Sequence, residues 1–336
     1  DMLSYCSKSM PYYNTISISG YHIREAGSTA AQELAFTLAD GFSYIEHGIN
    51  SGLKVDDFAP RLSFFFNSHL DFFEEIAKFR AARRIWAKRL RYKYQAKNEK
   101  SWKLRFHTQT AGCSLTAQQP ENNIARTGFQ ALAGVLGGTQ SLHTNSMDET
   151  LALPSEKAAE IALRTQQIIA FETGVSNVVD PLGGSWYLEK LTDEIEEAAE
   201  SYFNEIENIG GVIPAIEQGY FQREISRSAS EYQEKVDKNK RIVVGVNDFV
   251  KDNEEIDIPI LEISSKSAND QIKSLEKLKN SRDELALENS LNEVAIACKN
   301  NLNLVKPIIK AAKHYATIGE IVQKMKGEFG EWQESA

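Results

Sequence analysis

The segment from Ser17 to Gly27 holds a tyrosine, a histidine and a glutamate close together, as Tyr21, His22 and Glu25. A histidine can share a proton near neutrality and donate a hydrogen bond to a carbonyl or a developing oxyanion. A single histidine is more often structural than catalytic. The neighbouring glycine, tyrosine and glutamate nevertheless favour a functional role for His22.

Further hydrogen-bond donors recur in three later segments of the chain. These donors are Arg61, Ser63, Arg105, His107, Gln109, Gln140 and His143. Each is a weak signal alone, because an arginine that begins a strand is usually a surface charge and a glycine pair such as Gly137-Gly138 is often a turn. Together they predict a ring of donors around one axis, which a long polar ligand with phosphates would need.

Other kinds of site lack their motifs in this chain. There is no P-loop, no dinucleotide-binding fingerprint and no nucleophile elbow. His22, His107 and His143 lack the spacing of metal ligands, so no metal site is predicted.

The elements that would position these residues alternate between strand and helix. The predicted strands are 15–20, 61–66, 103–109 and 139–143, and each is followed by apolar residues at helical spacing, the first helix beginning near Ser28. This alternation predicts βαβ units and a parallel sheet in an α/β fold. Four such units are half of an eight-stranded barrel.

The predicted strands alternate between a polar and an apolar face. Ser17 and Ser19 oppose Ile16 and Ile18 in the first strand, and the later strands repeat the pattern. Because an ordinary barrel fills its axis with Val, Ile and Leu, a polar inner face indicates a ligand inside the barrel. The alternative is an open antiparallel sheet with one solvated face, which the intervening helices disfavour.

The second part of the chain has a different pattern of predicted secondary structure. After the turn-rich segment 180–185, charged amphipathic helices are expected at 191–207, 213–234, 264–280, 292–314 and 318–329, with a short strand at 241–246. We therefore expect two domains, 1–185 with the half-barrel and 186–336 as a mostly helical extension that docks or supports it.

Composition narrows the class of protein. The chain has 336 residues, 42% hydrophobic and 25% charged, and a net charge of −9, which disfavours general nucleic-acid binding. No apolar run is long enough for a membrane span, and three scattered cysteines fit a reducing compartment such as the cytoplasm. A basic stretch between Arg80 and Lys100 is either a solvated helix face or a site for a polyanionic ligand.

Long motifs of the chain resemble one family. They are ISGYHIREAGSTAAQELAFTLADG (18–41), FAPRLSFFF (58–66), LRFHTQTAG (104–112), LGGTQSLHTNSMDETLALP (136–154), IALRTQQIIAFETGVSNVVDPLGGSWY (161–187) and VVGVNDFV (243–250). These segments are similar to the large, substrate-binding subunit of methylmalonyl-CoA mutase and its relatives. The resemblance implies a TIM (β/α)8 barrel, of which the last four units are present, with coenzyme A along its axis and adenosylcobalamin at one end.

The resemblance also implies roles for individual residues. Tyr21 and His22 would lie at the reacting centre, with His22 hydrogen-bonded to the thioester carbonyl, and Glu25 and Glu149 would face the adenosyl group. The positions that match the coenzyme A site are Arg61, Ser63, Lys100, His107, Gln109 and Gln140.

The same resemblance implies what lies outside this chain. Relatives carry four earlier barrel strands, which select the acyl group, and a cobalamin domain that supplies the cobalt ligand. We expect the four earlier strands to be lost by truncation and the cobalamin domain to belong to a separate small subunit. The chain alone would then be inactive and would work in a hetero- or homo-oligomer. The expected reaction interconverts (R)-methylmalonyl-CoA and succinyl-CoA. The alternatives are an isobutyryl-CoA or 2-hydroxyisobutyryl-CoA mutase, a non-catalytic coenzyme A scaffold, or a non-radical lyase.

Overall fold

The chain divides into two compact units in the computed structural model, which describes residues 1–252, 258, 260–262 and 264–334. The larger unit is Asn14–Leu261, and the smaller one combines Asp1–Tyr13 with Glu262–Ala336. The boundary expected between residues 185 and 186 lies inside the larger unit. The reason is that α9 (Trp186–Ile209) packs against α3 (Ala30–Asn50) and α5 (Phe72–Lys88).

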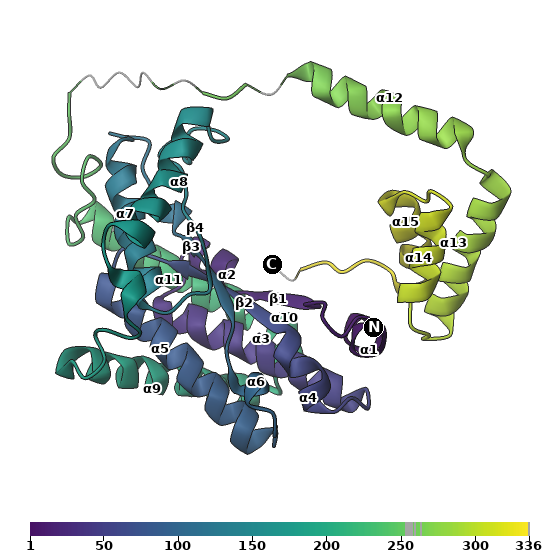
Figure 1. Ribbon diagram of the computed structural model, residues 1–336, viewed down its shortest axis with the longest axis horizontal. Coiled ribbons are helices and arrows are strands. Elements are labelled where there is room, and N and C mark those ends of the chain that lie inside the picture. The colour runs from purple at the N-terminus through teal and green to yellow at the C-terminus, as the bar shows by residue number, and fades with distance from the viewer. Residues whose placement is uncertain (253–257, 259, 263, 335–336) are drawn as a thin grey trace. The chain divides into compact units, whose positions relative to one another are not determined.

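A parallel sheet stands at the centre of the larger unit (Figure 1). Its described strands are β1 (Ile16–Ser19), β2 (Leu62–Ser68), β3 (Phe106–Thr110) and β4 (Ser141–His143), in the order β1-β2-β3-β4. Every neighbouring pair is parallel. The prediction of an α/β fold with parallel strands in these four segments is confirmed.

Helices join and cover these strands. Besides α3, α5 and α9, they are α2 (Tyr21–Glu25), α4 (Val55–Phe58), α6 (Glu99–Trp102), α7 (Asn122–Leu136), α8 (Glu156–Phe171), α10 (Val212–Glu217) and α11 (Tyr220–Asp237). Short turns of helix are η1 (Ala59–Arg61), η2 (Arg89–Lys93), η3 (Gly112–Ser114) and η4 (Val175–Asn177). The N-cap of α3 is Thr29, in a capping box with Gln32, so the N-cap lies one residue after the expected Ser28.

One face of the sheet is apolar and forms the core. Ile18, Leu62, Phe64, Phe66 and Phe106 are each at most 2% exposed. Aromatic rings of α5 pack against this face. The ring centroids of Trp86 and Phe64 are 4.9 Å apart, and those of Phe79 and Phe106 are 5.1 Å apart. Burial of one large apolar side chain contributes roughly 1.5–3 kcal/mol, so this face fixes the helices on one side of the sheet.

Gly20 connects β1 directly to α2. A Cβ at this position would lie 2.0 Å from Oγ1 of Thr37 in α3, so a side chain does not fit there. The Gly20 N–H donates to Phe65 O at 2.8 Å and extends the ladder between β1 and β2. Tyr21 therefore begins α2 at the carboxyl edge of the sheet.

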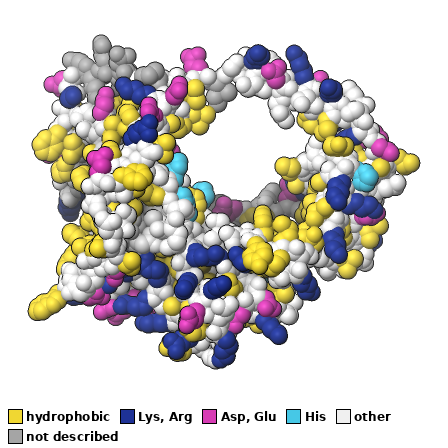
Figure 2. Space-filling model, in the orientation of Figure 1, with side chains coloured by type: hydrophobic (Ala, Val, Ile, Leu, Met, Phe, Trp, Pro, Cys, Tyr) yellow, Lys and Arg dark blue, Asp and Glu magenta, His cyan; other side chains and the backbone are white. Residues whose placement is uncertain are grey.

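Acidic residues of α9 pair with the basic residues of α5, and the two helices run side by side in Figure 1. The pairs include Arg80–Glu189 at 2.7 Å, Arg84–Asp193 at 2.6 Å and Lys88–Glu196 at 2.6 Å. In Figure 2, Lys and Arg side chains on the lower surface are interspersed with Asp and Glu. This part of the basic stretch is thus an interhelical ion-pair ladder, which neither of the two expected interpretations included.

Three predictions for the later segments are wrong in detail. Residues 241–246 form a turn with one bridge between Val244 and Asp248 and no named strand. The helix expected at 213–234 is two helices, because Gly219 adopts a φ of +66° between α10 and α11. The helix expected at 292–314 is also two, α13 (Glu284–Lys299) and α14 (Val305–Lys313), with Asn301 at a φ of +51° between them.

The smaller unit is helical. It contains α1 (Met2–Ser9), α12 (Ser265–Ser281), α13, α14 and α15 (Ile318–Phe329), and α15 has the predicted bounds. Its core is formed by Leu287, Leu291, Val294, Cys298, Ala311 and Ile321. Across the described residues of both units, no helix combines the length and the apolar character needed to cross a membrane.

Candidate functional site

The second face of the sheet is polar, as the alternation predicts, except for one aromatic residue. Strand register places Phe65 beside His107 and His107 beside Ser141, and it places Asn67 beside Gln109 and Gln109 beside His143. Two rows of side chains thus cross the sheet on this face. Phe65 was not predicted here, because an aromatic residue between Phe64 and Phe66 is easily assigned to the core.

Tyr21 packs on this face. Its ring stacks on Phe65 with centroids 5.0 Å apart and an interplanar angle of 15°. Its hydroxyl accepts a hydrogen bond from Gln109 Nε2 at 2.9 Å, and the same Nε2 also donates to Asn145 Oδ1 at 2.9 Å. Burial and then the Glu25 carboxylate raise the pKa of Tyr21, so the phenol stays protonated.

His22 lies beside Tyr21 and is exposed. Its Nδ1 is 3.2 Å from Ser19 Oγ, and its ring meets Tyr21 edge-on at 5.6 Å between centroids. The ring is therefore held through Nδ1, and Nε2 is the nitrogen that can meet a ligand at the carboxyl edge of the sheet.

Glu25 is held by donors from β2 and from the η3 turn that follows β3. Asn67 Nδ2 donates to Glu25 Oε1 at 2.6 Å, while the backbone N–H groups of Gly112 and Cys113 donate to its two oxygens at 2.9 and 2.8 Å. Burial raises the pKa of Glu25 and outweighs these hydrogen bonds, which lower it. A Cβ on Gly112 would lie 3.1 Å from Glu25 Oε2, a tight contact, so the close approach of this loop favours glycine.

Glu149 is electrostatically coupled to the same carboxyl. Partial burial, then Glu25 and Asp148, raise the pKa of Glu149. The two glutamates assigned to the adenosyl group by resemblance therefore share one environment, although no hydrogen bond joins them directly among the described residues.

The residues assigned to coenzyme A lie along the strands and at their starts. Arg61 is in η1 before β2, and Ser63 Oγ donates to Ile16 O at 3.2 Å. His107 Nδ1 lies 2.7 Å from Ser141 Oγ, and burial followed by His143 lowers the pKa of His107.

Two further assigned residues lie apart from this cluster. Gln140 Oε1 accepts from Phe106 N at 2.7 Å and its Nε2 donates to Gly138 O at 2.6 Å, so its side chain caps the start of β3. Lys100 is exposed on α6, and no hydrogen bond or ion pair joins its side chain to another assigned residue in the described part of the chain.

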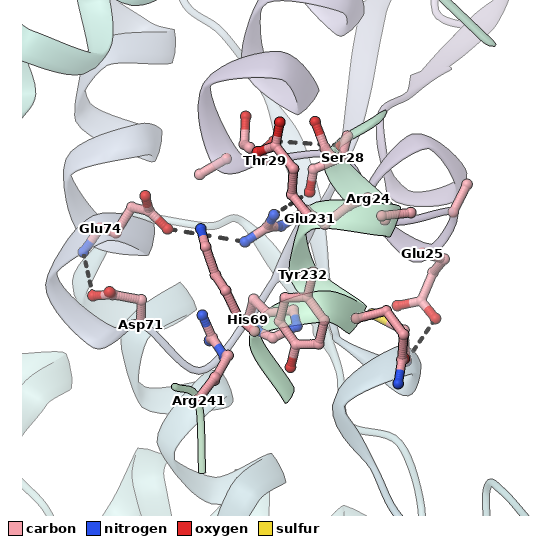
Figure 3. A pocket seen from close by; sticks show the side chains of 18 residues that line it. Arg24, Glu25, Ser28, Thr29, His69, Asp71, Glu74, Glu231, Tyr232 and Arg241 are labelled. Carbon is pink, nitrogen blue, oxygen red and sulfur yellow. Dashed lines mark hydrogen bonds and ion pairs between the residues drawn. The ribbon is translucent and has the colours of Figure 1, made fainter. Parts of the chain in front are cut away.

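Glu25 is one of the residues that line a cavity of about 500 Å³ (Figure 3). Its walls come from α2, the start of α3, the connection from β2 to α5, and α11, and include His69, Cys113 and Tyr232. Burial and then Arg24 lower the pKa of His69 to about 3, so its imidazole is neutral. Arg241 lies over the Tyr232 ring at 4.7 Å from its centroid. The cavity therefore carries charges of both signs and does not select one ligand charge.

Three residues that hold the site were not predicted from the sequence as members of it: Phe65, Asn67 and Asn145. Period-two alternation with Ser63 would have placed Phe65 and Asn67 on the polar face. Asn145 lies just beyond β4, and its Nδ2 donates to Thr110 O at 3.0 Å, which brings its Oδ1 to Gln109. No group of His, Cys, Asp and Glu suited to a metal ion occurs among the described residues.

The fold and the site define an α/β protein whose parallel sheet has one polar face, with Tyr21, His22 and Glu25 at its carboxyl edge. Residues 1–331 match the family model described as methylmalonyl-CoA mutase. The chain belongs to the methylmalonyl-CoA mutase family.

Individual relatives agree with this family. The chain is 47% identical over all 336 residues to the 2-hydroxyisobutanoyl-CoA mutase large subunit of Aquincola tertiaricarbonis, and covers 60% of that protein. It is 46% identical over 330 residues to methylmalonyl-CoA mutase of Escherichia coli (strain K12), and 45% over 333 residues to the mitochondrial enzyme of Homo sapiens. These matches take in 98% of this chain and 46% and 44% of the two enzymes. The chain spans about half the length of the curated relatives it matches.

Proposed function

We propose that the polar face of the β1–β4 sheet is the coenzyme A side of the active site of an adenosylcobalamin-dependent acyl-CoA mutase. This isomerase would move a thioester-bearing carbon between adjacent positions of a short acyl group. The observation that carries the proposal is Tyr21, fixed between Phe65 and Gln109 and next to His22 and Glu25, which are the family-matched residues of the reacting centre.

The fold that fits this proposal is the last half of a TIM (β/α)8 barrel. Among the described strands, β1 and β4 pair on one side only, so both could continue into further strands. Closure would place the polar face on the barrel axis and the ends of the strands, with Tyr21 and Glu25, at the catalytic face. The smaller unit and α9–α11 would be the helical extension of this domain.

His22 would act by hydrogen-bonding the thioester carbonyl oxygen as that group migrates. A donor placed before the reaction stabilises charge on the oxygen without reorganisation of solvent. Tyr21, held in the protonated form, would pack beside the acyl group and exclude water from it. Neither residue needs to gain or lose a proton in this role.

The carboxyl edge has chemistry that suits the adenosyl group of the cofactor. Glu25 and Glu149 offer carboxyl oxygens, which accept hydrogen bonds from hydroxyl and amino groups, and Glu25 is already held in place. When bound, adenosylcobalamin supplies the radical. Its cobalt ligand is proposed to lie on a separate domain or on a small subunit, and an oligomer of these chains is the proposed working form.

Coenzyme A would lie along the polar face toward the starts of the strands. Ser63, His107 and Gln109 present donors along this path, and Arg61, Gln140 and Lys100 lie near its beginning by their places in η1, before β4 and in α6. Cations at that end suit the coenzyme A phosphates.

The acyl group is proposed to be methylmalonyl and succinyl. A second candidate, a 2-hydroxyisobutyryl-CoA mutase, is favoured by the relative named for that activity, which matches the whole length of this chain. Isobutyryl-CoA is a further alternative. The three free cysteines fit a reducing compartment, and we propose the cytoplasm.

The experiment is His22→Ala in the full-length subunit assembled with its cobalamin partner. Loss of one positioned donor lowers turnover by roughly 10²–10³-fold. His47→Ala, an exposed histidine on α3, is the matched control and is expected to keep wild-type turnover. Unchanged turnover in His22→Ala would exclude the role of His22. Binding of acyl-CoA without any isomerisation would favour a scaffold instead.

A further inference from the structure

A cluster of buried charges lies between the core and Glu25. Lys78 of α5 is at its centre and is fully buried. Its Nζ donates to Glu33 Oε2 at 2.6 Å and to Asn67 O at 2.7 Å, and it also pairs with the Glu75 carboxylate. One ammonium thus joins α3, β2 and α5.

The first branch of this cluster leads through Asn67 to Glu25. Glu33 Oε1, the oxygen not used by Lys78, accepts the backbone N–H of Asn67 at 2.7 Å. Asn67 is therefore held at both its N–H and its C=O by the Lys78–Glu33 pair. Its side-chain Nδ2 then donates to Glu25 Oε1 at 2.6 Å.

The second branch leads through Arg24 to the helix that carries Glu25. Glu75 Oε1 lies 3.5 Å from Arg24 Nη2, and Glu74 Oε2 lies 3.9 Å from the same nitrogen. Figure 3 shows Arg24 directed toward Glu74, while Glu25 turns the other way. Because Arg24 and Glu25 are neighbours in α2, the cluster fixes the helix as well as the hydrogen-bond partner of Glu25.

A stabilising role does not account for such a cluster. Buried ion pairs recover little more than the cost of removing their charges from water, and apolar residues of similar size often serve a core as well. Lys78 contacts Glu33 and Glu75, Arg24 contacts Glu75, and each contact has a fixed direction. Apolar contacts do not impose such directions, whereas the placement of the Glu25 carboxyl requires them.

We infer that Lys78 and Glu33 are positioning residues, which act through Asn67 and Arg24 to hold the Glu25 carboxyl at the cofactor side of the site. The contact between Glu25 and the cofactor rests on the proposed function. The placement of the Glu25 side chain by the buried charges does not depend on that function. Loss of the Lys78–Glu33 pair leaves Asn67 free to shift and Glu25 without one of its anchors.

Cys113 reports the position of Glu25 without any assay of activity. Cys113 lines the cavity and is exposed, whereas Cys6 and Cys298 are buried. Enclosure by the protein, followed by the Glu25 carboxylate, raises the pKa of the Cys113 thiol to about 12. If Glu25 moves away, this pKa falls, and a fall of about one unit gives about tenfold more thiolate and faster alkylation.

The test compares Glu33→Gln and Asn67→Ala with wild type in the full-length subunit. Iodoacetamide is applied at several pH values, and mass spectrometry follows the peptides of Cys113, Cys6 and Cys298. We expect faster alkylation of Cys113 alone in both variants, with weaker binding of adenosylcobalamin and little change in KM for acyl-CoA. Asn67→Ala removes only the last link, so it remains informative if Glu33→Gln does not fold.

The control is Glu46→Gln, the same change on an exposed carboxylate of α3 that pairs with Lys93 at 3.3 Å. It is expected to match wild type at all three cysteines. Wild-type alkylation of Cys113 and wild-type cobalamin affinity in both test variants would overturn the inference. Equal acceleration at all three cysteines in both variants would overturn it too, because that is the result of a purely structural role. Absence of mutase turnover in wild type would refute the proposed function and leave the thiol result standing.

Discussion

Tyr21 of α2 lies flat against Phe65 of β2, with ring centroids 5.0 Å apart and an angle of 15° between the planes. Phe65 in turn meets His107 of β3 edge-on at 4.9 Å. One aromatic residue on an otherwise polar face therefore links the candidate reacting centre to the strand that presents His107 and Gln109. Without it, Tyr21 would keep only its hydrogen bond from Gln109 as a fixed contact with the sheet.

Phe65→Ala should therefore loosen Tyr21. The side chain is half-buried, so we expect a loss of about 1–2 kcal/mol in the free energy of unfolding, and a larger fall in kcat than rise in KM for acyl-CoA. Urea unfolding and steady-state kinetics measure the two effects. Phe129→Ala, at a ring that is 60% exposed on α7, is the control and should change stability by less than about 0.5 kcal/mol. Equal effects of the two variants would contradict the role of Phe65.

Gly20→Ala tests the close contact that places Tyr21. The added Cβ would lie 2.0 Å from Thr37 Oγ1, and such overpacking costs about 1–3 kcal/mol. Removing the obstacle in Gly20→Ala/Thr37→Ala should recover part of this loss in thermal unfolding. Gly319→Ala, in α15 with open space around it, is the control and should be neutral or stabilising. A Gly20→Ala protein as stable as wild type would show that the α2–α3 contact is loose.

The acid stability of the smaller unit should depend on Glu320. Glu320 accepts hydrogen bonds from both Nη atoms of Arg282 at 2.9 and 2.6 Å, and these contacts lower its pKa from 4.5 to about 2. The unfolded chain binds the proton first, so the contribution of Glu320 is complete above pH 4.5 and is lost as the pH falls from 4.5 to 2. Glu320→Gln should unfold with a flatter pH dependence across this window when followed by circular dichroism. The same slope in both proteins would contradict the assignment.

The ladder between α5 and α9 should contribute modestly and depend on salt. Glu196 contacts Lys88 at 2.6 Å and also pairs with Arg84, so Glu196→Gln weakens two pairs at once. Exposed pairs contribute about 0.2–1 kcal/mol each, and salt screens them. We expect the difference in unfolding free energy between wild type and variant to shrink between about 0.05 and 1 M NaCl, because the Debye length falls from more than about 10 Å to about 3 Å over this range. Glu194→Gln, at an exposed carboxylate of the same helix that pairs with Lys190 within α9, is the control.

Local patterns predicted much of the fold. The alternation of Ile16 and Ile18 with Ser17 and Ser19 predicted both the strand and its polar face, because side-chain direction in a strand has a period of two. Tyr21, His22 and Glu25 were predicted for a different reason: they stand close together in one segment of the sequence, which matches a family motif.

Contacts between distant segments could not be predicted in this way. From the sequence alone the acidic face of α9 is expected to be solvated, whereas in the structure it pairs with the basic face of α5, and α9 belongs to the larger unit. Lys78 and Glu33 are separated by 45 positions, and no local pattern indicates that both are buried. Phe65 was not assigned to either face, because an aromatic residue is more often part of a core than of a polar face.

The most direct test of the central claim is isomerisation by the full-length subunit assembled with its cobalamin partner. Methylmalonyl-CoA, isobutyryl-CoA and 2-hydroxyisobutyryl-CoA are each supplied with and without adenosylcobalamin, and the products are separated by chromatography. The account predicts rearrangement of at least one of these thioesters that requires adenosylcobalamin and is lost in His22→Ala. Tight binding of the thioesters with no rearrangement, or turnover that continues without the cofactor, would contradict it.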